Sequence, residues 1–162
     1  MFTPALLLLA KEVLDSAREK KLHIATAESC TAGLIAGLLT EIPGSSDVFE
    51  RGFVAYSNQA KEELLGVPAR LLAEFGAVSE EVAVVMATGA IEHSPADVSV
   101  AVTGIAGPGG GSGDKPVGLV HIAVYRKGNG ATHEVYHFGD IGRTEVRLKT
   151  IEAALGLLRE IL

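Results

Sequence analysis

Apolar residues recur at helical spacing near both ends of the chain. Residues 4–20 place them at i, i+3, i+4 and i+7, a rhythm that predicts an amphipathic helix. The C-terminal segment repeats this pattern, with one apolar face made of Ile151, Ala154, Leu155, Leu158, Ile161 and Leu162. The residues after Ser79 are apolar on all sides, which predicts a buried helix with Glu80 and Glu81 in its first turn.

Two shorter helices are predicted between these. Residues 29–39 are small and apolar, and Gly33 and Gly37 lie four residues apart, which indicates a closely packed, buried helix. A second short helix is predicted over 58–65, with Asn58 as its N-cap.

Runs of strand length fill most of the remaining chain. We predict strands over 23–27, 48–56, 98–102, 118–125 and 132–138. The sequence Asn129-Gly130 favours a hairpin turn between the last two strands. Gly52 is a candidate bulge in the second strand.

The order of these elements predicts the fold class. Helices and strands alternate first and a hairpin follows, which is typical of a single three-layer α/β/α domain, residues 1–162, with a mixed β-sheet. Ligands in such folds bind at the carboxyl ends of strands, where loops lead into helices. Three loops therefore qualify: the loop around Ser29, the loop over 56–58, and the glycine-rich loop after Val102.

The charge balance narrows the classes of partner. The 162 residues carry 14 Lys and Arg against 20 Asp and Glu, a net charge of -6. Proteins that grip nucleic acid need a basic face, so we expect no nucleic-acid partner. The early apolar run over 5–10 is far shorter than the ~20 residues of a membrane span, so no membrane partner is expected. The single cysteine excludes an internal disulfide and fits a reducing, cytoplasmic location.

The first candidate for chemistry is Ser29, at the predicted end of a strand and start of a helix. The N–H groups of Cys30, Thr31 and Ala32 would point at an anion or oxyanion beside its hydroxyl. A simple N-cap is the competing interpretation, because serine is a preferred cap. Cys30 is a competing nucleophile, although a lone cysteine at such a position is more often a small buried residue.

The second candidate is Lys61. With Asn58 as the cap, Lys61 falls in the first turn of a helix, where the positive helix end lowers the pKa of an amine. A neutral lysine can take a proton from serine, and Tyr56 could relay that proton. The competing interpretation is a surface lysine beside a tyrosine at the edge of the core.

The third candidate is the glycine-rich loop over 103–113 (TGIAGPGGGSG). It follows a strand, so its backbone could approach a ligand through Thr103, Gly104, Gly107 and Gly109. Its spacing matches neither a P-loop nor G-x-G-x-x-G. A flexible loop without a ligand is the competing interpretation.

Arg143 and Arg147 lie one turn apart at the start of the last predicted helix. Two arginines at this spacing can hold a phosphate, and a solvated basic patch is the competing interpretation. His133 and His137 are expected on an exposed strand face, and no metal is expected because no histidine stands in a ligand pattern.

Four motifs occur in order along the chain: AESCT at 27–31, FERGFVAYSN at 49–58 followed by Lys61, GAVS at 76–79, and TGIAGP at 103–108. Together they resemble the CinA C-terminal domain family, over about Leu7 to Leu158. The chain departs from the family pattern at Ala32, where the common motif has glycine, and in the segment just before Arg143.

The resemblance implies an enzyme. The family includes nicotinamide-nucleotide amidohydrolase, which implies hydrolytic deamidation of nicotinamide mononucleotide to nicotinic acid mononucleotide and ammonia. It implies a catalytic set of Ser29, Tyr56 and Lys61, a serine acyl-enzyme, and no metal or organic cofactor. It also implies that the domain occurs in a stand-alone form and that it can assemble as a homodimer. A non-catalytic nucleotide-sensing or interaction module, and an amidase for another small carboxamide, are the alternatives.

Overall fold

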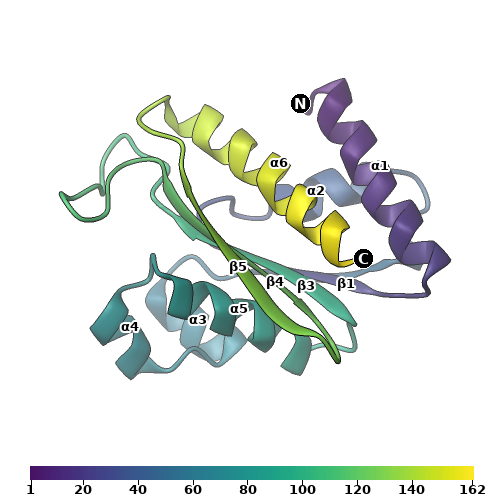
Figure 1. Ribbon diagram of the computed structural model, residues 1–162, viewed down its shortest axis with the longest axis horizontal. Coiled ribbons are helices and arrows are strands. Elements are labelled where there is room, and N and C mark those ends of the chain that lie inside the picture. Colours follow the sequence, from purple (N-terminus) through teal and green to yellow (C-terminus); the bar gives the residue numbers. More distant parts are fainter.

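The computed structural model describes residues 1–162 and has a central five-stranded sheet covered by helices on both faces (Figure 1). The helices are α1 (Pro4–Glu19), α2 (Leu34–Thr40), α3 (Asn58–Leu65), α4 (Ala69–Phe75), α5 (Glu80–Glu92) and α6 (Arg143–Ile161). The strands are β1 (Ile24–Glu28), β2 (Phe49–Val54), β3 (Val98–Gly104), β4 (Leu119–Arg126) and β5 (Gly130–His137). The predicted three-layer α/β/α fold is confirmed.

The sheet is mixed, with strand order β2-β1-β3-β4-β5. β1 pairs in parallel with β2 and β3, whereas β4 is antiparallel to both β3 and β5. Glu28 at the end of β1 is level with Val54 of β2 and Val102 of β3. The carboxyl ends of three parallel strands therefore meet at one edge, where this fold class binds ligands.

Two apolar cores lie on the two faces of the sheet. Helices α1, α2 and α6 cover one face, against which the β-branched side chains of β3 pack. Helices α3, α4 and α5 cover the other, where the sheet presents alanines such as Ala25, Ala27, Ala101 and Ala123. These small side chains let α5 pack close to the sheet.

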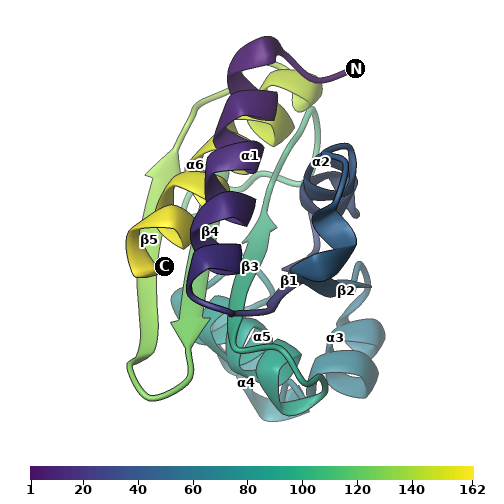
Figure 2. The same ribbon diagram turned by 90° about the vertical axis from the view of Figure 1, so that its right-hand side faces the viewer.

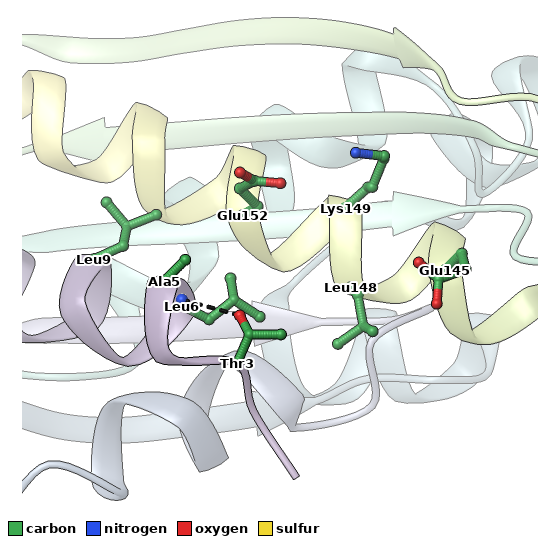
Figure 3. Close-up of a pocket in the computed structure, with 8 residues that line it drawn as sticks. All are labelled: Thr3, Ala5, Leu6, Leu9, Glu145, Leu148, Lys149 and Glu152. Carbon is green, nitrogen blue, oxygen red and sulfur yellow. Dashed lines mark hydrogen bonds between the residues drawn. The ribbon is translucent and has the colours of Figure 1, made fainter.

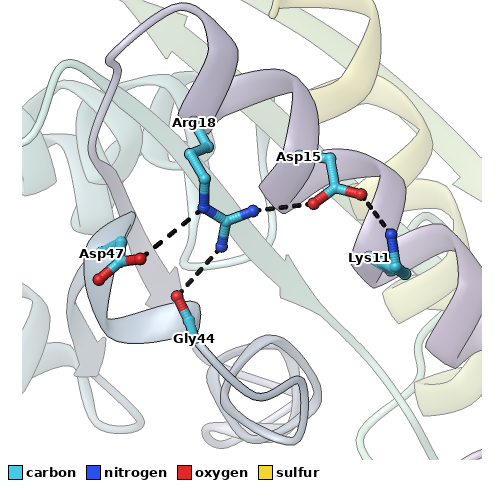
Figure 4. Close-up of polar contacts among 5 residues, drawn as sticks. All are labelled: Lys11, Asp15, Arg18, Gly44 and Asp47. Atoms are coloured by element: carbon cyan, nitrogen blue, oxygen red, sulfur yellow. Dashed lines mark hydrogen bonds and ion pairs between the residues drawn. The ribbon is translucent and has the colours of Figure 1, made fainter.

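Helix α1 lies between α6 and α2 on its face of the sheet (Figure 2). Arg18 links the end of this helix to the turn that follows α2 by donating to the carbonyl of Gly44 at 3.1 Å, and it also bonds to Asp15 within α1 at 2.8 Å (Figure 4). Asp47 lies 3.9 Å from the same guanidinium, and Lys11 pairs with Asp15. These contacts are solvent-exposed, so each contributes little to stability. No helix is long and apolar enough to cross a membrane.

The structure corrects the predicted start of α2. The helix begins at Leu34, and residues 29–33 form a separate turn in which Ala32 has φ 50° and Gly33 has φ 92°. Both values lie in the left-handed region, so the right-handed helix cannot extend back to Ser29. Helix α4 was not predicted, because its seven residues bury only Leu72 and carry no clear apolar stripe.

Gly52 is not the bulge of β2. The irregularity falls at Glu50, since Phe49 and Arg51 pair with consecutive residues of β1. Gly52 is required for a different reason: a Cβ there would lie 2.9 Å from Oγ1 of Thr26. The predicted hairpin between β4 and β5 is confirmed.

Helix α5 offers a sharp test of this packing. A Cβ on Gly89 would lie 2.0 Å from the carbonyl oxygen of Leu65, so alanine cannot fit without moving the backbone of α3. We expect Gly89→Ala to destabilise the fold by about 1–3 kcal/mol, despite the higher helix propensity of alanine. Chemical denaturation measures the difference.

Gly156→Ala in α6 is the matched control, because no atom lies within 4 Å of a Cβ at that position. Only the difference in helix propensity should then act, and the free energy of unfolding of the variant should rise by up to about 1 kcal/mol. Equal effects of the two substitutions would contradict the close contact between α5 and α3.

Candidate active site

A small cavity opens at the edge where β1, β2 and β3 end. Its volume is about 210 Å³. The residues that line it are Ser29, Cys30, Tyr56, Asn58, Lys61, Ala77, Val78, Thr103, Gly104, Ala106 and Arg143. Four loops and the start of α6 thus converge on one place, at the strand edge that the fold class predicts.

At the floor of this cavity a serine contacts a lysine. The Nζ atom of Lys61 lies 3.0 Å from Oγ of Ser29, and 3.1 Å from the main-chain carbonyls of Ala55 and Tyr56. Ser29 is 8% exposed and Lys61 only 1%, so both groups are shielded from bulk water. The interpretation of Lys61 as a surface lysine is therefore wrong.

The surroundings of Lys61 favour its neutral amine. Burial lowers the pKa of Lys61, and no carboxylate contacts Nζ to oppose this effect. A neutral amine has two N–H donors and one lone pair. When the amine is neutral, the two carbonyls can accept its two N–H bonds, and the lone pair is then free to accept the hydrogen of the Ser29 hydroxyl. The geometry is that of a general base beside a nucleophile.

The fold of α3 explains how Lys61 reaches this place. The cap of α3 is Ser57, whose Oγ accepts from the N–H of Ala60 at 3.0 Å, so the prediction of Asn58 as the cap is wrong by one residue. Lys61 stays in the first turn, where its N–H donates to the carbonyl of Ser57. Because helical side chains lean towards the N-terminus, its amine extends back to residues 55 and 56.

Ser29 follows β1 but does not cap α2. Its N–H donates to the carbonyl of Val102 at 3.0 Å, which fixes it to the neighbouring strand, and its hydroxyl contacts Lys61. The N–H of Ala32 is used internally, since it donates to the carbonyl of Ser29. The N–H groups of Cys30 and Thr31 make no hydrogen bond within the protein. Of these two, only the N–H of Cys30 belongs to a residue that lines the cavity, because Thr31 is fully buried. One of the three expected donors therefore remains for an oxyanion.

The carboxylate of Glu28 caps α2, a role that sequence reasoning missed. It accepts from the N–H groups of Gly33, Ile35 and Ala36 at 2.9–3.0 Å, and from the hydroxyl of Thr31 at 2.7 Å. An acid near the positive end of a helix is the one signal for it in the sequence.

Arg143 lies at the mouth of the cavity. Its guanidinium donates to the carbonyl of Gly107 at 2.8 Å and to the hydroxyl of Tyr56 at 3.2 Å. Tyr56 is 59% exposed, and Arg143 is the one partner of its hydroxyl. Tyr56 thus contacts Lys61 through its main-chain carbonyl. Its hydroxyl accepts a hydrogen bond from Arg143 and makes none with Ser29 or Lys61.

The remaining predicted residues lie outside the cavity. Arg147 donates to the carbonyl of Thr31 at 3.1 Å, behind the turn, so it does not share the cavity with Arg143. Gly107 and Gly109 do not line the cavity, and neither does Thr31.

The end of β3 forms one wall of the site. The hydroxyl of Thr103 donates to the carbonyl of Ala77 at 2.8 Å, which fixes the segment before α5 against the strand. A Cβ on Gly104 would lie 2.8 Å from the carbonyl oxygen of Leu119, so close strand packing already requires this glycine. The glycine-rich loop is therefore shaped at least partly by packing.

A second hollow, between the N-terminus of α1 and α6, lacks such chemistry (Figure 3). Its one hydroxyl, that of Thr3, accepts the capping N–H of Leu6 at 3.2 Å. No group of three or more His, Cys, Asp or Glu could hold a metal ion. On β5, His137 is exposed as predicted, but His133 is partly buried and bonds to His121 at 2.9 Å.

Comparison with known proteins decides the family. The model of the CinA C-terminal domain matches residues 7–162. The chain belongs to the CinA C-terminal domain family. A CinA-like protein of Akkermansia muciniphila is 49% identical over 160 residues, and one of Geotalea uraniireducens is 53% identical over 144. These matches cover 98% and 88% of this chain, which spans only 38% and 34% of those relatives.

Solved structures of CinA proteins have the same fold. The competence/damage inducible protein CihA from Agrobacterium tumefaciens superposes with a TM-score of 0.96 at 52% identity, covering 98% of this chain and 96% of that one. A CinA superfamily protein from Escherichia coli gives 0.92 at 35% identity, covering 100% and 94%. The chain is thus a CinA-like domain, related to proteins named for competence and damage induction.

The burial of Cys30 leads to a direct test of the competing nucleophile. Burial raises the pKa of its thiol to about 12, and the residue is 5% exposed, so the reactive thiolate is almost absent near neutral pH. We expect iodoacetamide at pH 8 to leave the folded protein unmodified and to alkylate the unfolded protein fully. Intact mass measures both. Rapid alkylation of the folded protein would restore Cys30 as a candidate nucleophile.

Proposed function

We propose that this domain hydrolyses the carboxamide of nicotinamide mononucleotide to give nicotinic acid mononucleotide and ammonia. The observation that carries the proposal is the 3.0 Å contact between Ser29 Oγ and the buried amine of Lys61, inside a cavity at the carboxyl edge of the sheet. Membership of the CinA C-terminal domain family supports this substrate, because the sequence resemblance implies the same deamidation.

The reaction proceeds through a serine acyl-enzyme. The neutral amine of Lys61 takes the proton of Ser29 as its Oγ attacks the carboxamide carbon. The N–H of Cys30 stabilises the oxyanion of the tetrahedral intermediate. Lys61 then returns the proton to the leaving ammonia, and the C–N bond breaks. Water, activated by the same amine, hydrolyses the acyl-enzyme and releases the carboxylic acid.

The cavity fits part of the substrate. Its volume of about 210 Å³ lies below the ~300 Å³ at which pockets for drug-sized ligands begin, so it suits one aromatic ring rather than a nucleotide. Ala77, Val78 and Ala106 supply apolar contacts to such a ring. The ribose phosphate then lies at the mouth, where Arg143 can contact an anion and no carboxylate lines the cavity.

Ammonia release from nicotinamide mononucleotide tests the function. We expect Ser29→Ala to abolish release while its melting temperature stays within a few degrees, because Ser29 makes no side-chain bond except that to Lys61. Cys30→Ala is the control and should remain active, since its thiol is buried and protonated.

A wild-type protein that releases no ammonia from nicotinamide mononucleotide would contradict the proposed substrate. Activity of the wild type on other small carboxamides alone would indicate an amidase of different specificity. An active Ser29→Ala protein would contradict the acyl-enzyme.

The pH profile tests the base. Because burial lowers the pKa of Lys61, the amine becomes neutral at lower pH than a free lysine does. We expect kcat/KM to rise with pH through an apparent pKa well below about 10.4, and to level off above it. Lys61→Arg keeps the charge but cannot release a proton, so it should be nearly inactive at every pH.

Turnover of Lys61→Arg at the wild-type rate would show that position 61 supplies only positive charge. Lys61→Met, which matches the length of the stem and lacks the amine, separates loss of the base from loss of packing.

A further inference from the structure

The carboxylate of Glu28 is fully buried, and no step of the proposed reaction uses it. Its Oε2 accepts from the hydroxyl of Thr31 at 2.7 Å and from the N–H groups of Gly33 and Ile35 at 3.0 Å each. Its Oε1 accepts from the N–H of Ala36 at 2.9 Å. All four partners are donors, so both oxygens serve as acceptors and an amide could not replace the carboxylate without a clash of donors.

These bonds hold a turn that the local sequence does not stabilise. Ala32 has φ 50°, a conformation that is costly for a residue with a Cβ and persists only where the surroundings impose it. The side chain of Thr31 is anchored to Glu28, and its carbonyl accepts from Arg147 at 3.1 Å. Thr31 is therefore held at its side chain by the carboxylate of Glu28 and at its carbonyl by the guanidinium of Arg147.

The fixed residue directly follows Cys30, which lines the cavity beside Ser29. The N–H of Cys30 has no partner within the protein, and its direction depends on the conformation of this turn. A shift of one donor by a fraction of an ångström weakens its bond to an oxyanion, because such bonds require close alignment.

We propose that Glu28 is a positioning residue: acting through the hydroxyl of Thr31, it holds the N–H of Cys30 in place as an oxyanion donor beside Ser29. Arg147 supports the same turn from the opposite side. The proposal rests on the proposed function for the role of Ser29 as nucleophile, but not on the identity of the substrate.

The test therefore uses a serine-directed probe as well as the substrate. With a fluorophosphonate, Oγ of Ser29 bonds to phosphorus, the P–F bond breaks, fluoride leaves, and Lys61 takes the serine proton. The phosphoryl oxygen gains negative charge in the transition state and needs the same oxyanion donor. Intact mass gives the labelling rate, and Ser29→Ala confirms the labelled residue.

Thr31→Val removes the hydroxyl at nearly constant volume, and we expect it to slow labelling by at least about tenfold. The apparent pKa of the labelling rate, which reports Lys61, should not move. Thr31→Ser restores the hydroxyl and should restore most of the rate. Thr150→Val is the matched control: it removes another buried threonine hydroxyl, bonded to Val146 within α6, and should label at the wild-type rate.

Glu28→Gln should slow labelling at least as much as Thr31→Val. Where that variant fails to fold, the comparison of Thr31→Val with Thr31→Ser carries the test alone, with melting temperatures as the check on folding.

Four outcomes are decisive. Slow labelling of folded Thr31→Val with rescue by Thr31→Ser supports the proposal. Wild-type labelling of Thr31→Val overturns it, and so does a wild type that does not label at Ser29. If labelling behaves as expected but nicotinamide mononucleotide is not hydrolysed, the substrate is wrong and the positioning role of Glu28 stands.

Discussion

The site depends on burying a lysine without a counter-ion. Two main-chain carbonyls and a serine hydroxyl surround the amine of Lys61, and none of them carries a charge. Burial of an unpaired ammonium is expensive, so the fold itself drives this group towards the neutral form. The surrounding elements follow from this constraint. Parallel β1 and β2 end level with each other, and α3 begins at once, which brings its first-turn lysine beside the residue after β1.

The two helices beside the site contribute in different ways. Helix α3 carries Lys61 into a buried position, and this burial disfavours the charged form of its amine. The N-terminus of α2 is already satisfied by Glu28, so its N–H groups are not available to a substrate. In the proposed reaction, a donor for an oxyanion must therefore come from the turn that precedes α2. Under that proposal the geometry of residues 29–33 matters to catalysis and not only to the chain connection.

The sequence predicted the long helices and the pair of Ser29 and Lys61, but not the helix caps or the residues that hold the turn after β1. Helices α1, α5 and α6 carry long apolar patterns, and Ser29 and Lys61 follow strands that end at one edge. The cap at Ser57 was missed because serine and asparagine are both good caps in adjacent positions. The capping role of Glu28 was missed because its partners lie three to eight residues later in the sequence. Only the folded turn brings these partners to its carboxylate. Arg147 lies on the same face of α6 as Arg143, but it is one helical turn further along the helix. It therefore contacts the carbonyl of Thr31 instead of the cavity mouth.

The placement of Arg143 has a consequence for how the site comes into being. Ser29 and Lys61 lie within the first 61 residues, whereas the arginine that bridges Tyr56 and Gly107 belongs to the last helix. During synthesis from the N-terminus, strands and helices of the first two thirds can emerge before α6 exists. Until α6 is in place, the cavity lacks the guanidinium of Arg143, and the apolar residues of α6 are missing from the core. The final helix therefore completes both the core and the lining of the cavity.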